Sequence, residues 1–141
     1  MVDQRFAVSV HIMTVLAFEN CSRGSLMTSE KLASSIRTNP TVVRRLVARL
    51  TDANLVRSYK GKSGGIELAR KADEISLRDI YSASSEKTLL KARNKRPARQ
   101  CPVSCSMGKL MKDVIDGVET NSMDYLAKIS LADLAAKVSK E

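Results

Sequence analysis

Residues 38–50 read TNPTVVRRLVARL, and this stretch decides how the rest of the chain is interpreted. Asn39 before Pro40 is a helix start signal, because Asn caps backbone N–H groups and Pro needs no N–H partner at the first helical position. At about 100° per residue, one face of the expected helix 40–53 carries aliphatic side chains: Val43, Leu46, Val47 and Leu50. The opposite face and its flanks carry small or basic side chains: Thr41, Arg44, Arg45, Ala48 and Arg49. The stretch predicts a helix that packs on a core with one side and exposes a basic surface with the other.

A shorter helix is expected directly before this one. Thr28 is a suitable N-cap, and Glu30 places a negative charge in the first turn, where the helix dipole favours it. The helix would span residues 29–36, and the break at 37–38 leaves only a tight turn before the basic helix. Two short helices joined in this way are typical of a helix-turn-helix, whose second helix enters the major groove of DNA.

A β-hairpin is expected next. Two short alternating runs, at residues 55–59 and 66–69, flank the basic, glycine-rich tip KGKSGG of residues 60–65. After a helix-turn-helix, such a hairpin is a wing, whose lysines can reach phosphates or the minor groove while the glycines let the backbone lie close to DNA. The alternative is a flexible surface turn.

A long helix is expected towards the C-terminal end. It would begin after Cys105 and extend to about residue 128, with apolar residues at heptad-like steps: Met107, Leu110, Met111, Val114 and Val118. This seam has no obvious partner within the chain, so its simplest partner is the same helix in a second subunit.

Three further helices complete the expected fold, at residues 4–19, at 77–84 behind the cap Ser76, and after the cap Ser130. The fold class is therefore mostly α with a small β-hairpin. We expect a winged helix-turn-helix domain at 1–84, a basic connector with a cysteine segment at 85–105, and a dimerisation helix with a C-terminal helix at 106–141.

The positive charge is concentrated rather than spread. The 141-residue chain has a formal net charge of +9, and residues 36–71 hold nine basic against two acidic side chains. Residues 86–99 hold six basic side chains against one acidic one. Two such segments in an otherwise near-neutral chain favour a polyanionic partner over a merely solvated surface. No stretch approaches the ~20 apolar residues of a membrane helix, and the first residues do not resemble a signal peptide, so we expect a cytoplasmic protein with no membrane partner.

These motifs together resemble the Rrf-two family of bacterial winged-helix transcription regulators. The match is carried by RFAV at 5–8 with His11, TSEKLA at 28–33, TNPTVVRRL at 38–46, and LVRS at 55–58 before the glycine pair 64–65. The resemblance covers essentially the whole chain. The sequence departs from the family at the wing, where Lys62-Ser63 replaces a frequent Pro-Gly and Ile66 replaces an aromatic residue.

The resemblance implies a homodimer crossed through the long helix, which reads a palindromic operator on double-stranded DNA, usually as a repressor. Its helix-turn-helix contacts would be Thr28, Ser29, Asn39, Thr41, Arg44, Arg45 and Arg49. Its wing contacts would be Arg57, Lys60, Lys62 and Ser63. By residue type, an arginine can give a bidentate contact to guanine, whereas Thr28 and Asn39, at helix N-termini, suit phosphates.

Cys101 and Cys105, before the long helix, are the candidate sensor. Relatives that bind iron–sulfur clusters place three cysteines in this segment, and the shortage here argues against a standard cluster. A cluster completed by His11 or Asp3 of the other subunit remains an alternative. We prefer thiol chemistry, because a helix N-terminus and nearby Arg and Lys residues favour the reactive thiolate, and oxidation could move the long helix. A third interpretation is two unreactive thiols, with Cys21 as a spectator.

Two other functions compete with a sequence-specific regulator. A thiol oxidoreductase would use Cys101 and Cys105, but the C-x-x-C spacing and the surrounding βαβ pattern are missing. A non-specific architectural protein would bind any duplex equally, whereas a regulator discriminates by several kcal/mol. A single histidine leaves little for general-base chemistry, so we expect no enzyme and no resident cofactor.

Overall fold

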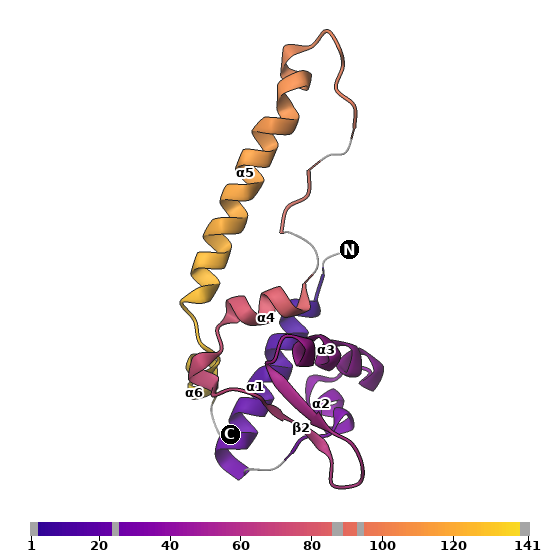
Figure 1. Ribbon diagram of the computed structural model, residues 1–141, viewed down its shortest axis with the longest axis vertical. Coiled ribbons are helices and arrows are strands. Elements are labelled where there is room, and N and C mark those ends of the chain that lie inside the picture. The colour runs from indigo at the N-terminus through magenta and orange to yellow at the C-terminus, as the bar shows by residue number, and fades with distance from the viewer. Residues whose placement is uncertain (1–2, 24–25, 86–88, 93–94, 139–141) are drawn as a thin grey trace.

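The computed structural model describes residues 3–23, 26–85, 89–92 and 95–138, with side chains at all of these except 20–23. The helices and strands, labelled in Figure 1, are α1 (Arg5–Arg23), α2 (Ser29–Ile36), α3 (Pro40–Asp52), β1 (Val56–Tyr59), β2 (Gly65–Leu68), the 3-10 turn η1 (Ala72–Glu74), α4 (Leu77–Ser84), α5 (Pro102–Ala127) and α6 (Leu131–Ala136). This mostly helical chain with one hairpin confirms the expected fold class.

The core forms around α1, which packs against α2, α3, β2, α4 and α6. Ile12, Met13 and Leu16 of α1 are fully buried. The helix continues to Arg23, several residues beyond its expected end at residue 19. The face of α3 predicted to be apolar is the buried one: Val43, Leu46, Val47 and Leu50 are all at most 6% exposed.

Side-chain caps set the ends of the two helices of the helix-turn-helix. The Thr28 hydroxyl accepts a hydrogen bond from the Lys31 N–H at 3.1 Å, and the Asn39 side-chain oxygen accepts one from the Thr41 N–H at 2.8 Å. Between them, Arg37 adopts a left-handed conformation with φ 62°, which ends α2 and reverses the chain. Both predicted start signals are confirmed.

The hairpin is antiparallel, with Ser58 opposite Ile66 and Tyr59 opposite Gly65. The backbone of Met27 pairs with Ile66 in both directions, at 3.1 and 2.7 Å, and this bridge ties the hairpin to the loop before α2. Gly64 is required at the tip, because a Cβ there would overlap the carbonyl group of Tyr59. The wing is therefore attached firmly beside the helix-turn-helix.

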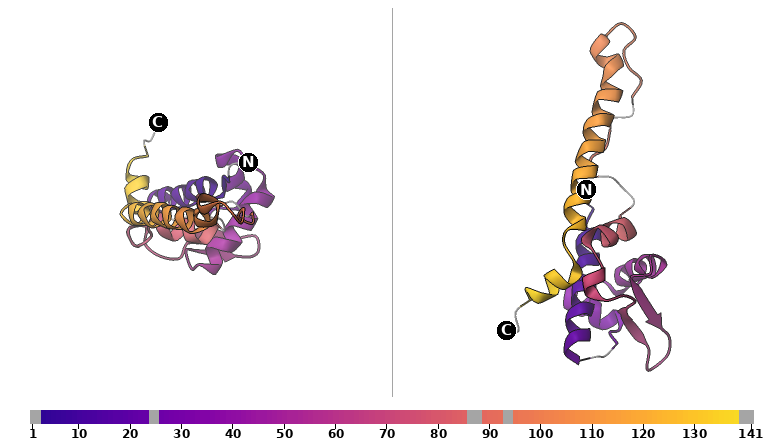
Figure 2. Two further views of the ribbon diagram at one scale, coloured as in Figure 1. Left: turned by 90° about the horizontal axis from the view of Figure 1, so that it is seen from above. Right: turned by 60° about the vertical axis from the view of Figure 1, so that its left-hand side comes forward.

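Helix α5 projects away from the domain (Figures 1 and 2). It begins at Pro102, with Cys101 as its N-cap, and not after Cys105 as the sequence suggested. Pro suits the first helical position, so the start signal was present in the sequence. The 26 residues of α5 give a length of about 39 Å at 1.5 Å per residue.

After α5 the chain returns to the domain through a short backbone bridge. The Leu77 N–H donates to the Ile129 carbonyl at 2.9 Å, and the Leu131 N–H donates to the Ile75 carbonyl at 2.8 Å. Helix α6 then packs on α1, on the side of the domain opposite α3 and the hairpin (Figure 2). The base of α5 is thus joined to the helix-turn-helix domain.

The connector between α4 and α5 has neither helix nor strand in its described residues, 85, 89–92 and 95–101. Of the basic segment predicted at 86–99, Glu86, Lys87 and Arg93 lie outside the described residues. None of the described helices combines the length and the apolar character needed to cross a bilayer.

Two adjacent valines of α3 test how the core depends on this helix. Val43 is 0% exposed and Val42 is 38% exposed. We expect Val43→Ala to lower the free energy of unfolding by about 2 kcal/mol, because it removes buried methyl groups and leaves a cavity. Val42→Ala should change it by less than about 0.5 kcal/mol. Urea denaturation at one fixed protein concentration measures both, and equal losses would contradict the assigned packing.

Candidate nucleic-acid interface

A groove lies between the start of α2, the exposed side of α3 and the hairpin. It is lined mainly by Thr28, Ser29, Glu30, Arg44, Ala48, Thr51, Ser58 and Tyr59, with the glycines of the wing tip. The backbone bridge between Met27 and Ile66 holds the hairpin beside the start of α2, and Ile66 itself lines the groove. Residues from three separate parts of the sequence therefore line one surface.

The outward face of α3 matches the predicted basic surface. Thr41, Arg45 and Ala48 are exposed and lie opposite the buried valines and leucines. Arg44 lies on the flank of this face that borders the groove. Small side chains at Thr41 and Ala48 let the helix backbone come close to a partner, with long cationic side chains on either side.

Arg44 is held in an ion pair across the helix-turn-helix. Its Nη2 donates to Oε1 of Glu30 at 3.0 Å, and the two side chains are 57% and 68% exposed. The pKa of Glu30 is lowered, chiefly by a hydrogen bond from its own backbone N–H and then by the bond from Arg44. Both interactions favour the charged carboxylate, which lies in the groove together with Arg44 and Asp52.

Arg49 lies apart from the other predicted contacts. Its Nη1 donates to the carbonyl of Ser84, the last residue of α4, at 3.4 Å. The side chain occupies the flank of α3 that faces α4, away from the groove. The geometry favours a role in fixing α3 on α4 over direct contact with a ligand.

The two capping residues keep donors that can face outward. Capping uses an oxygen of Thr28 and of Asn39 as an acceptor. The hydroxyl hydrogen of Thr28 and the amide group of Asn39 are donors in addition. Both residues can therefore cap a helix and hold a phosphate at the same time, as expected from their positions.

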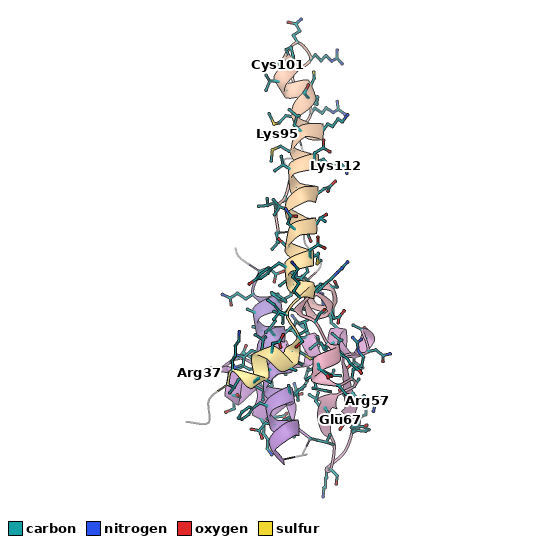
Figure 3. The ribbon with its side chains drawn as sticks, turned by 90° about the vertical axis from the view of Figure 1, so that its left-hand side faces the viewer. Arg37, Arg57, Glu67, Lys95, Cys101 and Lys112 are labelled. Atoms are coloured by element: carbon teal, nitrogen blue, oxygen red, sulfur yellow. The ribbon has the colours of Figure 1, made fainter. Side chains whose placement is uncertain are left out.

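The side chains of β1, which include the predicted contact Arg57, divide between the two faces of the hairpin. Arg57 is opposite Glu67, and its Nη2 donates to the Ala69 carbonyl at 3.4 Å, towards the base of the wing. Tyr59 donates to Oε1 of Glu67 at 2.9 Å. Figure 3 shows Arg57 and Glu67 side by side on the hairpin. Ser58 points to the groove instead, because side chains alternate along a strand.

The tip of the wing carries the remaining predicted contacts. Lys60, Lys62 and Ser63 are all exposed. Lys60 and Ser63 also border a small hollow beside Tyr59. The tip therefore presents cations beyond the end of the groove.

Sequence reasoning missed several residues that line the groove, among them Glu30, Thr51, Asp52, Ser58 and Tyr59. Glu30 was assigned only a role at its own helix terminus, yet the acidic residue lies 14 positions before the arginine that it pairs with. Alternation along β1 was the available signal for Ser58, because Val56 is buried and the strand carries every second side chain to the same face.

Cys101 lies at the far end of α5, remote from the wing (Figure 3), and Cys105 lies in the first turn of the same helix. The Cys101 sulfur accepts a hydrogen bond from the Ser104 N–H at 3.4 Å, and the Cys105 sulfur donates to the Ala98 carbonyl at 3.4 Å. The backbone N–H of Cys105 bonds to the Cys101 carbonyl at 3.0 Å. Both thiols thus lie at the first turn of the helix, and each makes a hydrogen bond with a different backbone group. The side chain of Cys21 lies outside the described residues.

Within one chain, the part that the structure describes does not bring together the donor groups of an iron centre. Among the described residues, no three His, Cys, Asp or Glu side chains gather as metal ligands. His11 belongs to α1 in the helix-turn-helix domain, whereas Cys101 is at the opposite end of the molecule. Asp3, the other suggested ligand, is paired with Arg5 at 2.9 Å.

Helix α5 has two distinct long faces. One side contacts α4, where Glu119 accepts a hydrogen bond from the Tyr81 hydroxyl at 3.4 Å. Burial is the main cause that raises the pKa of Tyr81, and the negative charge of Glu119 is the second. A separate apolar stripe, confined to an arc of about 100° at 100° per residue, is exposed: Val103, Met107, Leu110, Met111, Val114, Val118 and Tyr125.

Comparison with protein families gives one match over nearly the whole chain. The model of the Rrf2 family, described as an iron-dependent transcriptional regulator, matches residues 2–137. YwnA of Bacillus subtilis, named as an HTH-type transcriptional regulator, is 30% identical over 134 residues, which are 95% of this chain and 96% of that protein.

Solved structures agree in fold. The global cysteine regulator CymR of B. subtilis has a TM-score of 0.69 at 20% identity, covering 99% of this chain and 98% of CymR. IscR of T. potens has a TM-score of 0.70 at 23% identity, covering 100% of this chain and 93% of IscR. A transcriptional regulator from Lactobacillus plantarum has a TM-score of 0.78 at 25% identity, covering 94% and 88%.

Proposed function

The chain belongs to the Rrf2 family of transcriptional regulators, and on that premise we propose that it is a sequence-specific repressor that binds a palindromic operator as a homodimer. DNA-binding regulation is the common function of the family and of the named relatives, which are regulators and not enzymes. The sequence specificity, the symmetry and the sign of regulation are our proposal.

The observation that carries the proposal is the division of α3 into two faces. Its aliphatic side is buried in the core, so Thr41, Arg45 and Ala48 must face outward from a rigid domain. A helix held in this way can lie in a major groove, where arginine recognises guanine through two hydrogen bonds. The wing tip, with Lys60, Lys62 and Ser63, would then reach the neighbouring phosphates or the minor groove.

The apolar stripe of α5 supports the homodimer. Seven large apolar side chains on one face of a solvent-exposed helix form a patch that monomeric proteins rarely expose. The same stripe in a second copy is complementary to it under twofold symmetry. Such a dimer would place two copies of α3 on one duplex, related by a twofold axis. The operator would then be palindromic. Because the operator is bacterial DNA, we expect the protein to act in the cytoplasm.

Cys101 and Cys105 form the proposed redox sensor. Peroxide would oxidise the two thiols to one disulfide, with both thiol hydrogens leaving in water. Two cysteines four residues apart at a helix start can approach the Cα separation of a disulfide, but here each sulfur has another hydrogen-bond partner. The disulfide would therefore require the first turn of α5 to open, and the loss of that turn is the proposed signal.

Charge reversal on α3 tests the DNA interface. Arg45→Glu is expected to weaken operator binding by about 100-fold or more, because two subunits each lose a contact worth ~1–3 kcal/mol. Lys109→Glu, on α5, is the control because it makes the same charge change away from the groove. Fluorescence anisotropy with a duplex enriched from a random library by the wild-type protein gives both affinities. Unchanged binding by Arg45→Glu would refute the interface, and equal wild-type affinity for every duplex would indicate an architectural protein.

Substitution in the stripe tests the dimer. Val114→Glu places a charge in the centre of the stripe and is expected to give a monomer that has lost most operator affinity. Thr120→Glu adds the same charge on the opposite side of α5 and should leave the dimer intact. Analytical ultracentrifugation measures the assembly state. A wild-type monomer, or a Val114→Glu variant that remains a dimer, would contradict the assignment.

Thiol counting tests the sensor. In a Cys21→Ser background, mild peroxide should remove both remaining thiols of each chain and change operator affinity by about fivefold or more, within the usual range of allosteric coupling. Cys101→Ser and Cys105→Ser should each abolish the response. Equal affinity of the oxidised and reduced proteins would identify the thiols as unreactive bystanders.

A further inference from the structure

We infer that Glu30 is a specificity-determining residue: it restrains Arg44 so that this arginine favours guanine over the DNA backbone. The inference rests on the proposed DNA-binding function and concerns a residue that is not among the predicted contacts. Glu30 lies in the first turn of α2 and Arg44 in α3, and the two side chains meet within the groove that borders the wing.

The ion pair occupies a position where DNA is expected. The N-terminus of a helix is a natural phosphate site, and Thr28 and Ser29 at the start of α2 line the groove. Glu30 places a carboxylate beside them, and hydrogen bonds from its own backbone N–H and from Arg44 stabilise the charged form and lower its pKa. A phosphate that approached Arg44 would meet this negative charge.

Guanine and phosphate place different demands on Arg44. The observed contact uses a single donor, Nη2, towards Oε1 of Glu30. A guanidinium has five N–H donors, so it can give two to O6 and N7 of guanine while it keeps Glu30. Neutralising a phosphate instead brings two anions together on one cation. Glu30 therefore weakens DNA binding little where Arg44 contacts a guanine of the operator. It weakens binding more at sites where Arg44 contacts only phosphate oxygens.

Glu30 affects the ratio of the affinity for the operator to the affinity for other DNA. Lysines and arginines that swing to phosphates strengthen binding to any sequence, whereas specificity depends on how much tighter the operator is bound than other DNA. By restraining one arginine of each subunit, Glu30 lowers non-specific binding more than operator binding.

Glu30→Gln tests the inference, because glutamine keeps the shape and removes the charge. Asp52→Asn is the matched control. It removes the same charge from the same groove, but the ion pair of Arg44 is with Glu30 and not with Asp52. Affinities are measured at several salt concentrations for two duplexes: one enriched from a random library by the wild-type protein, and one with the same composition in scrambled order. Circular dichroism melting verifies that each variant is folded.

We expect Glu30→Gln to bind the scrambled duplex about five- to tenfold more tightly, with a steeper salt dependence, and the enriched duplex less than about twofold more tightly. Asp52→Asn should strengthen binding to both duplexes by the same factor. In an Arg44→Gln background, Glu30→Gln should leave the affinity ratio unchanged.

Three results would overturn the inference. If Glu30→Gln strengthens binding to both duplexes equally, or leaves both affinities unchanged, Glu30 does not determine specificity. If the loss of specificity persists in the Arg44→Gln background, Glu30 does not act through Arg44. A wild-type protein that binds both duplexes equally would instead refute the proposed function, and the inference with it, so the two failures are distinguishable.

Discussion

The burial of one aliphatic face of α3 is the constraint on which the interface depends. Val43 and Leu50 are completely buried in the core around α1. Once these residues are fixed, the rotation of α3 about its axis is fixed as well, and Arg44, Arg45 and Arg49 can only point along three different directions. They therefore meet three different surroundings: the groove, solvent and α4.

Much of this arrangement could be predicted because it is encoded locally. The caps Thr28, Asn39, Ser76 and Ser130 all accept hydrogen bonds from the helices they precede, as their residue types predict. The apolar period of α3 gave its buried face correctly. A local pattern of this kind depends only on residues within one or two turns, so a single sequence contains it in full.

What could not be predicted depends on contacts between distant segments. Periodicity places Arg49 beside the exposed face of α3, but only the position of α4 shows that its guanidinium meets the Ser84 carbonyl. The pairing of Arg44 with Glu30 likewise follows from the angle between α2 and α3. The early start of α5 is a different case, since Pro102 signalled it, and a cysteine is simply an unusual N-cap.

Helix α5 meets the domain at its C-terminal end and carries its two thiols at the other. The join combines backbone hydrogen bonds, between Leu77 and Ile129 and between Ile75 and Leu131, with apolar packing of Leu126 and the fully buried Leu131 on the core. A rod about 39 Å long acts as a lever, for which a swing of about 5° at the base moves the tip by about 3 Å. Because main-chain bonds and core packing act together at this joint, any bending there is magnified along the rod into a displacement of the end that carries the thiols.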